Sequence, residues 1–523
     1  MSLLPIPPGP PFIASRQLKV GGGGNRAVIF GDSITAQNFA GNTITAISST
    51  GGVGSFTVSS SVGYYPGAKV YITGTYVNPD GTIGTGGIPE ALHGVKTIIS
   101  GSGTNWTFDA TGAPDGGSIG TAPFPRAYNL SQFIDIGWFV WGQILANQPF
   151  DLVGFSASTG RYTAEALQRI SEVTQYNANY AFVLLGTNDT SGATEANLPM
   201  SQVFANLTAI WQTFLKAGTK VVAITIPPQG GSTPSTATVN DRVDRLNKFI
   251  RDTVRATPGM YLLDMYAALV NPVSATIGQP LAGMINQTDG LHPTTRGAYT
   301  VGKAFAALVP SILPVVDIRT NTNGDNRGAT ANSANILDSA PWVTSGATPD
   351  TPVTGTLPTG WRALRQGTPA INPAMSVVSR ADGVGYDVKC DMTGGANGDG
   401  IFVLSNSSAS TTLQSRLPSA PFSLSLINTM KVTGQAGSNL YTINSYYSVT
   451  VGANTGDITA LGSSIYTSAS ENVPEDWSGT LRTPPVTFST KPTAITVSPM
   501  RAFVSAAGTA FSAQFGRASL LLS

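Results

Sequence analysis

The stretch RAVIFGDSIT, residues 26–35, decides which fold the rest of the chain can adopt. Arg26 to Phe30 form a short apolar run of the length of one strand, and Gly31 follows as a turn signal. Such short runs are typical of strands that are buried on both faces of a parallel sheet. Ser33 therefore lies in a turn at the carboxyl end of a predicted buried strand, which is where parallel sheets bind their ligands.

Downstream of this stretch, predicted strands and helices alternate. The predicted strands are residues 151–154, 180–185, 220–226 and 260–263, and the predicted helices are residues 128–146, 163–173, 201–217, 239–255 and 294–313. This alternation predicts an α/β domain with a parallel sheet that helices cover on both sides. The aromatic residues Trp138, Phe139 and Trp141 are expected to pack against that sheet as part of its core.

The remaining sequence has the texture of β-structure, and 523 residues are too many for one compact core. We expect a lead-in at residues 1–25, a small β module inserted at 41–123, a polar linker at 317–335 and a jelly-roll-like β-sandwich at 336–523. The α/β domain then comprises residues 26–40 and 124–316. Polar linkers mark boundaries that few contacts cross, so the sandwich is expected to be separable.

Charge and composition exclude several classes of partner. Charged residues make up 11% of the chain, and 29 Lys+Arg against 28 Asp+Glu give a net charge of +1, so no basic surface for nucleic acid is expected. No run reaches the roughly 18 apolar residues of a membrane span, and the first twenty residues lack the pattern of a secretion signal. Cys390 is the single cysteine, and we expect it to be a small buried apolar residue.

Four short segments at or near strand ends carry the residues that acyl transfer needs. They are GDSIT at residues 31–35, GFSASTGR at 154–161, GTND at 186–189 and DGLHP at 289–293. A serine hydroxyl becomes a nucleophile when a neighbouring base takes its proton. His292 can act as that base for Ser33, and Asp289 can hold the second ring nitrogen and fix the tautomer.

The tetrahedral intermediate needs hydrogen-bond donors aimed at its oxyanion. The candidates are the backbone N–H of Ser33, the side-chain amide of Asn188 and the N–H of a glycine after the second strand, either Gly154 or Gly160. Asp32 and Asp189 are expected to be structural, and Asp189 is also placed to orient Asn188. His93, the other of the chain's two histidines, is expected in a turn or on the surface. No His, Cys or carboxylate cluster has metal-ligand spacing, so neither a metal nor another cofactor is expected.

In this order, the four segments resemble the conserved blocks of the SGNH/GDSL hydrolase family. Ser33 matches the serine of block I, Asn188 the asparagine of block III, and Asp289 and His292 the Asp-x-x-His of block V. The resemblance covers residues 26–40 and 126–313 and implies a flavodoxin-like fold and a serine esterase. In block II the setting of Gly160, directly before a predicted helix, looks closer to the acetylesterase-like version, and Gly154 stays open as the alternative.

The β-rich parts favour a carbohydrate substrate, because their Thr, Ser, Asn, Tyr and Trp suit sugar rings. We therefore expect a carbohydrate O-acetylesterase or deacetylase acting on an acylated polysaccharide. Residues 335–338 through 360–361, with 92–97 and 106–108, resemble modules of phage tail-spike and tail-fibre proteins. That resemblance implies a virion protein attached to a phage tail, a homotrimer that acts outside the cell. A secreted bacterial polysaccharide or xylan acetylesterase and a non-enzymatic receptor-binding protein are the alternatives.

Overall fold

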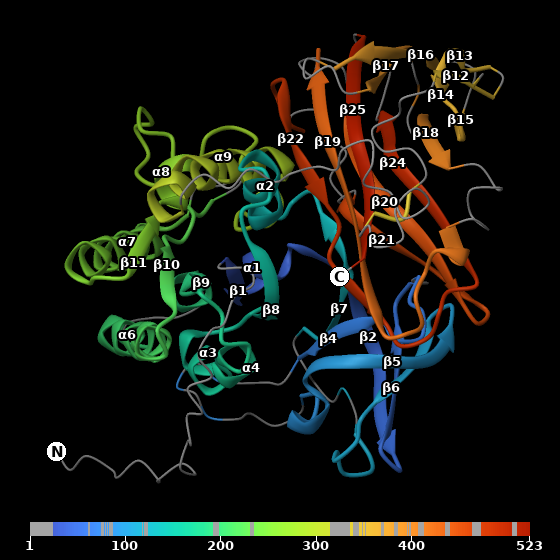
Figure 1. The fold of residues 1–523 in the computed structure, drawn as a ribbon. Coiled ribbons are helices and arrows are strands. Elements are labelled where there is room, and N and C mark those ends of the chain that lie inside the picture. Colours follow the sequence, from blue (N-terminus) through green and yellow to red (C-terminus); the bar gives the residue numbers. More distant parts are fainter. Residues whose placement is uncertain are drawn as a thin grey trace.

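The computed structural model describes residues 25–313 and 335–522, with short gaps. The gaps are residues 61–62, 75–77, 79, 81, 83–86, 118, 120–123, 192–197, 231–234, 338–344, 348, 351, 368–370, 381–384, 395, 397–398, 406–412, 435–439, 463–471 and 505–509. The predicted lead-in and almost all of the predicted linker lie outside the described residues. Figure 1 shows the helices and a parallel sheet on the left and large β-sheets on the right.

A five-stranded parallel sheet forms the centre of the α/β part. Its spatial order is β11 (Met260–Leu263), β10 (Lys220–Ile224), β9 (Tyr180–Leu184), β1 (Arg26–Gly31) and β8 (Asp151–Ala157). All four pairings are parallel. Read in chain order, this is the flavodoxin-like arrangement, in which the order of strands reverses beside β1. The predicted α/β fold is therefore confirmed, and the ligand-binding edge lies where β1 and β9 end.

Helices cover both faces of this sheet. Phe182 on β9 contacts Phe139 of α2 (Trp138–Leu145) and Phe305 of α9 (Thr295–Ile312), with ring centroids 5.2 Å apart in both pairs. Phe30 faces the opposite side, because its neighbour Ile29 is the residue paired with Phe182, and it contacts Phe214 of α6. The expected core role of the aromatic helix is thus confirmed. The other helices are α1 (Ser33–Ala36), η1 (Glu90–Leu92), α3 (Thr163–Gln168), α4 (Ser171–Thr174), α5 (Thr187–Ser191), α6 (Met200–Lys216), α7 (Ala237–Ala256) and α8 (Met265–Leu269).

One predicted helix is partly wrong. Residues 128–134 belong to strand β7 (Arg126–Ile134), and the helix begins only at Trp138. Strand β7 pairs with residues 39–43 along one edge, and with residues 70–73 and then β21 (Asn454–Gly462) along the other. These partners are distant in sequence. The buried face of β7 also carries the polar residues Asn129 and Ser131, so the strand lacks the apolar–polar alternation that predicts a half-buried strand.

Through β7, the inserted strands and the C-terminal strands share one sheet. The insertion contributes β2 (Phe39–Thr50), β3 (Val53–Val58), β4 (Lys69–Thr73), β5 (Gly94–Ser102) and β6 (Asn105–Asp109), and the C-terminal part contributes β15 (Trp361–Gln366), β18 (Gly400–Ser405), β20 (Leu440–Val451), β21 and β24 (Ala494–Val504). The β-content expected for both regions is confirmed. Their joining into a single sheet was not expected.

A second C-terminal sheet packs against the first. It contains β13 (Thr354–Gly355), β16 (Ile371–Ser379), β17 (Tyr386–Gly394), β25 (Phe511–Leu522), β19 (Phe422–Thr433), β22 (Trp477–Arg482) and β23 (Val486–Phe488), while β12 (Ser345–Ala347) and β14 (Leu357–Pro358) form a separate pair. Tyr447 of β20 donates a hydrogen bond to the carbonyl of Leu424 on β19 across the two layers. Cys390 on β17 is fully buried, as expected.

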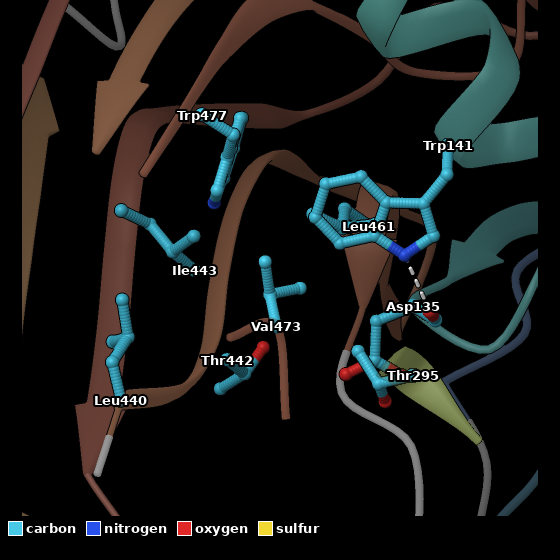
Figure 2. Close-up of a pocket in the computed structure, with 9 residues that line it drawn as sticks. All are labelled: Asp135, Trp141, Thr295, Leu440, Thr442, Ile443, Leu461, Val473 and Trp477. Atoms are coloured by element: carbon cyan, nitrogen blue, oxygen red, sulfur yellow. Dashed lines mark hydrogen bonds between the residues drawn. The ribbon is translucent and has the colours of Figure 1, made fainter. Parts of the chain in front are cut away.

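The C-terminal part is docked on the helices of the α/β part. Trp141 lies edge-to-face between Tyr299 and Trp477, with ring centroids 5.2 Å apart in both pairs. Trp141 and Trp477 line a cavity of about 20 Å³ (Figure 2). Ion pairs join Lys303 to Glu475 at 2.6 Å and Arg482 to Asp151 at 2.7 Å. The expectation that few contacts cross this boundary is therefore wrong, because the apolar face of α2 is covered by β22.

In the part of the chain that the structure describes, no helix is both long and apolar enough to cross a membrane. Within the same residues, no group of three or more His, Cys, Asp or Glu side chains is arranged to hold a metal ion.

Candidate active site

Ser33 lies at the carboxyl end of β1, in a turn that requires glycine before it. A Cβ atom at Gly31 would lie 2.6 Å from the carbonyl oxygen of Leu184, so the close approach of β1 and β9 excludes a side chain there. Asp32 caps α1, and its carboxylate accepts the N–H of Ile34 at 3.1 Å. Ser33 is then the first residue of α1, and its N–H has no acceptor within the helix.

A loop before α9 presents His292 to this serine. The loop is held by the pairing of Ile285 with Pro293 and by the bond from the N–H of Asn286 to the carbonyl of His292. His292 Nε2 lies 2.8 Å from Ser33 Oγ, and His292 Nδ1 lies 2.9 Å from Asp289 Oδ2. The fold thus brings Ser33 and His292, which are 259 positions apart, into contact. Both distances are within hydrogen-bond range, so the serine, the histidine and the aspartate are linked in series.

Asp289 is arranged to remain ionised beside the imidazole. Its Oδ1 accepts the N–H groups of Leu291 and His292 at 2.8 and 3.1 Å. Partial burial raises the pKa of Asp289, but the hydrogen bonds from His292 and the backbone outweigh it and hold that pKa below its ordinary value. An ionised Asp289 fixes the proton on Nδ1, so Nε2 is free to accept the proton of Ser33.

The residues expected to bind the oxyanion lie along the same edge of the sheet. Asn188 follows β9, and its Nδ2 donates to the carbonyl of Arg161 at 2.9 Å. An amide carries two N–H groups, and no acceptor for the second is recorded among the described residues. Asn188 can therefore bind the loop between β8 and α3 and a substrate oxygen at once.

The two glycines of the second segment occupy different environments. Gly154 lies within β8, where a Cβ would lie 2.4 Å from the ring of Tyr176, so packing explains this glycine. Gly160 lies beyond the end of β8 with φ +76°, in the loop whose Arg161 carbonyl binds Asn188. Position therefore favours Gly160 over Gly154, and the donor role of its N–H stays a prediction.

Asp32 and Asp189 are structural carboxylates at strand ends. Asp189 is fully buried and accepts the N–H of Thr163 at 3.1 Å and its hydroxyl at 2.7 Å. It thus holds the start of α3, next to the loop that Asn188 binds. Burial raises the pKa of Asp32 and of Asp189 to about 6 in each case, although hydrogen bonds oppose the shift.

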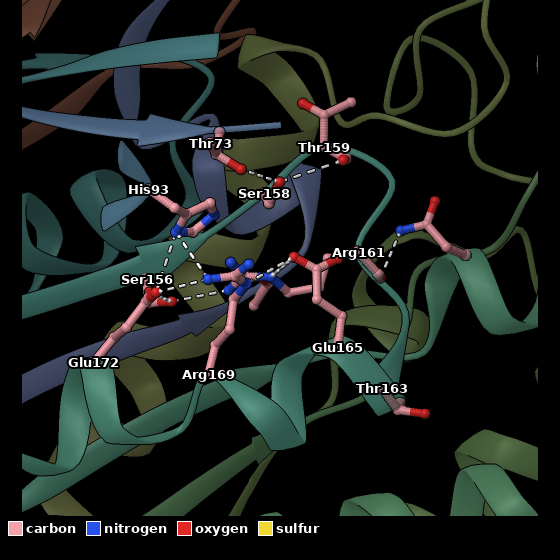
Figure 3. Close-up of polar contacts among 12 residues, drawn as sticks. Thr73, His93, Ser156, Ser158, Thr159, Arg161, Thr163, Glu165, Arg169 and Glu172 are labelled. Atoms are coloured by element: carbon pink, nitrogen blue, oxygen red, sulfur yellow. Dashed lines mark hydrogen bonds and ion pairs between the residues drawn. The ribbon is translucent and has the colours of Figure 1, made fainter. Parts of the chain in front are cut away.

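Of the two positions expected for His93, the turn is found, because its N–H bonds to the carbonyl of Glu90 at the end of η1, but the surface position is wrong. His93 is 6% exposed, and its Nδ1 lies 3.1 Å from Glu172 Oε1 and 3.1 Å from a guanidinium nitrogen of Arg169 (Figure 3). Burial lowers the pKa of His93, although the bond to Glu172 opposes the shift. A histidine between turn signals looks exposed in the sequence, but here helix α4 of the α/β part covers it.

This histidine belongs to a buried polar cluster that the sequence did not reveal, which we call the Arg161 cluster. Its members are Tyr71, His93, Ser156, Arg161, Glu165, Arg169 and Glu172. Burial alone would raise the pKa of Glu172. Hydrogen bonds from His93 and Ser156 and the positive charge of Arg161 outweigh burial and hold this pKa well below its ordinary value, so Glu172 is ionised. The available signal was Arg161 in STGR, because a charged residue close to the end of a buried strand needs partners.

One protein-family model matches part of the chain. The GDSL-like lipase/acylhydrolase family matches residues 127–299, a range that includes Asn188, Asp289 and His292 and begins after Ser33. A search of curated proteins found no match.

Among solved structures, the chain is similar to a catalytic mutant of an acetylxylan esterase from Geobacillus stearothermophilus (14% identity, 57% of this chain and 99% of that chain, TM-score 0.32). It is also similar to a GDSL-like lipase from Bacteroides thetaiotaomicron (18% identity, 30% and 73%, TM-score 0.25) and to a lipase/acylhydrolase from Enterococcus faecalis (22% identity, 31% and 77%, TM-score 0.26).

The family match and the flavodoxin-like strand order both favour a hydrolase domain in this part of the protein. The hydrogen bonds that link Ser33 to His292 and His292 to Asp289 have the geometry that acyl transfer needs. Residues 127–299 of this chain match the GDSL-like lipase/acylhydrolase family, and together with β1 and Ser33 they make up the flavodoxin-like domain that holds the triad.

Proposed function

We propose that this protein is a serine esterase that removes O-acetyl groups from a polysaccharide. The observation that carries the proposal is the contact of 2.8 Å between His292 Nε2 and Ser33 Oγ, with Asp289 behind the imidazole. Ser33 Oγ attacks the ester carbonyl while His292 takes its proton, and His292 then protonates the leaving alcohol. Water, activated by the same histidine, hydrolyses the acyl-enzyme.

Two features around the triad support a bulky sugar substrate. The Asp289 side chain is 38% exposed, so the catalytic loop lies at the surface, where a polymer can approach it. Phe124 is 46% exposed, and its ring would meet a side chain placed at Gly160 at 3.1 Å. An exposed aromatic face beside the oxyanion site offers a sugar ring an apolar surface.

The test is a panel of acetylated bacterial polysaccharides with released acetate as the readout, alongside a chromogenic acetate ester. We expect acetate release from at least one polymer and none from the Ser33→Ala variant. If the chromogenic ester is hydrolysed and no polymer releases acetate, the proposed carbohydrate substrate is contradicted, but the proposed esterase activity is not. No hydrolysis of either would favour a receptor-binding protein on an inactive hydrolase scaffold.

The proposal extends to the biological setting: a homotrimeric phage tail spike that deacylates capsule or lipopolysaccharide outside the cell. Its support is the sequence resemblance of residues 335–338 through 360–361 and of 92–97 with 106–108 to tail-spike modules. Light scattering on the purified full chain tests the assembly. A trimer would support this setting, and a stable monomer would contradict it.

A further inference from the structure

The loop between β8 and α3 connects to two of the predicted oxyanion donors. It contains Gly160, and the carbonyl of Arg161 accepts the amide of Asn188 at 2.9 Å. A shift of this loop would therefore move both donors relative to Ser33. What fixes the loop in place also fixes the geometry of the oxyanion site.

The side chain of Arg161 anchors the loop from within the protein. It is fully buried, and one terminal nitrogen donates to Ser156 Oγ at 2.9 Å (Figure 3). The other terminal nitrogen donates to the hydroxyl of Tyr71, also at 2.9 Å. Ser156 comes from β8 of the α/β part, but Tyr71 comes from β4, an inserted strand. A buried guanidinium that loses an acceptor carries a large desolvation penalty, so it would move to find another.

The Tyr71 hydroxyl also joins two charged members of the cluster, Arg161 and Glu172. It donates to Glu172 Oε2 at 2.8 Å while it accepts from Arg161. His93, also from the inserted segment, contacts the other oxygen of Glu172 at 3.1 Å. The inserted segment thus holds Glu172, one of the two carboxylates whose charge balances Arg161.

A second contact ties the same loop to the same inserted strand. Thr73 of β4 shares a hydrogen bond with Ser158, two residues before Gly160, in a fully buried setting. Strand β4 therefore contacts the loop on both sides of Gly160, through Ser158 and through Arg161. None of the inserted residues belongs to the triad.

We propose that the inserted β-strands are a working part of the esterase site: Tyr71, acting through Arg161, is a positioning residue that fixes the oxyanion loop. The inference rests on the function proposed above. Donors aimed at the oxyanion act on charge that develops only in the transition state. Loss of the anchor should therefore lower kcat and leave KM nearly unchanged.

The test compares Tyr71→Phe with Tyr65→Phe, using kcat and KM on a chromogenic acetate ester and Tm for each variant. Tyr65 is a matched control, because it is also fully buried in the inserted segment and its hydroxyl also lies 3.1 Å from a serine, Ser131. We expect kcat of Tyr71→Phe to fall by about tenfold or more, with KM within about twofold of the wild type. Tyr65→Phe should keep the wild-type kcat and cost less in Tm, because it loses a hydrogen bond to a neutral serine.

A wild-type kcat in folded Tyr71→Phe, or an equal fall in both variants, would overturn the inference. If Tyr71→Phe does not fold, Thr73→Val decides, because it removes the contact to Ser158 with little change of shape. A lower kcat at unchanged KM in that variant supports the inference, and a wild-type kcat overturns it. If the wild-type protein hydrolyses no ester, both the proposed function and this inference are refuted. If the wild-type protein is active, the variants test this inference by itself.

Discussion

The triad and the Arg161 cluster are both polar networks at the same end of the parallel sheet, but their surroundings differ. The His292 and Asp289 side chains are 17% and 38% exposed on a loop, whereas those of Arg161 and Glu165 are 0% and 6% exposed. Groups that must meet substrate need access, while groups that only hold a backbone can be buried at a stability cost. Changes in the triad should therefore affect activity, and changes in the cluster should affect stability and the alignment of donors.

The largest effect is expected for Ser33→Ala. Removal of the nucleophile should lower kcat/KM on a chromogenic acetate by about 10⁴-fold or more, because no other group can form the acyl-enzyme. Tm should remain close to the wild-type value, since among the described residues the Ser33 hydroxyl makes a single hydrogen bond, to His292. Thermal unfolding and steady-state kinetics on the same preparation check both points. Substantial remaining activity would remove Ser33 from the mechanism.

Asp289→Asn should come next, with a loss in kcat of about 10³- to 10⁴-fold. An amide donates to Nδ1, which leaves the proton on Nε2, where it blocks acceptance from Ser33. Asp350→Asn is a matched control, because Asp350 pairs with Arg362 at a surface position remote from the triad. Equal activity of Asp289→Asn and the control would show that the carboxylate has no role in the tautomer.

Asn188→Ala should lower kcat by about 10²-fold and change KM little, because one oxyanion donor is lost. The variant also loses the hydrogen bond to the carbonyl of Arg161. A fall in kcat at unchanged KM, as expected for Tyr71→Phe, would therefore link Asn188 to the loop between β8 and α3. Asn428→Ala is the control, since it removes a buried asparagine whose amide bonds to Pro499 in the C-terminal sheets. A rise in KM without a fall in kcat would place Asn188 in ground-state binding.

The smallest effect concerns the pH dependence of stability. Burial lowers the pKa of His93, so below about pH 6.5 the unfolded chain takes up a proton that the folded chain does not, and the free energy of unfolding falls. Asp32 and Asp189, with pKa values raised to about 6, act in the opposite direction as pH falls from 6 towards 4. The contribution of His93 therefore has to be measured as a difference in the free energy of unfolding between the wild type and a His93 variant.

The comparison is wild type against His93→Gln, unfolded with denaturant at pH 7.5 and 5.5. The wild type should lose more stability than the variant between the two values, so the gap in free energy of unfolding narrows at pH 5.5. A gap that stays constant would mean that His93 titrates alike in both states. A gap that widens would mean that Glu172 raises the pKa of His93 more than burial lowers it.

The sequence predicted the parallel sheet and the triad residues because both are encoded locally. RAVIF and the later apolar runs have the pattern of buried strands, and DGLHP contains both triad partners within four residues. Strand β7 was assigned to a helix because its neighbours lie at residues 39–43, 70–73 and 454–462. Pairing over such distances leaves little trace in a local pattern.

The same reason explains the missed cluster and the missed docking surface. His93 and Arg161 are ordinary polar residues until the fold brings Glu172 and Tyr71 to them. Trp141 was correctly expected in the core, but no local pattern indicates that part of this core is Trp477. A chain that ends near residue 314 would expose that face, so its independent stability is not expected.

The central claim, that Ser33 is the nucleophile activated by His292, is tested most directly by covalent labelling. The full chain is treated with a serine-directed phosphonylating reagent, digested and analysed by mass spectrometry. The account predicts one adduct on the peptide that contains Ser33, formed as activity is lost, and little labelling of folded His292→Ala. An adduct on a different serine, or full activity after stoichiometric labelling of Ser33, would contradict it.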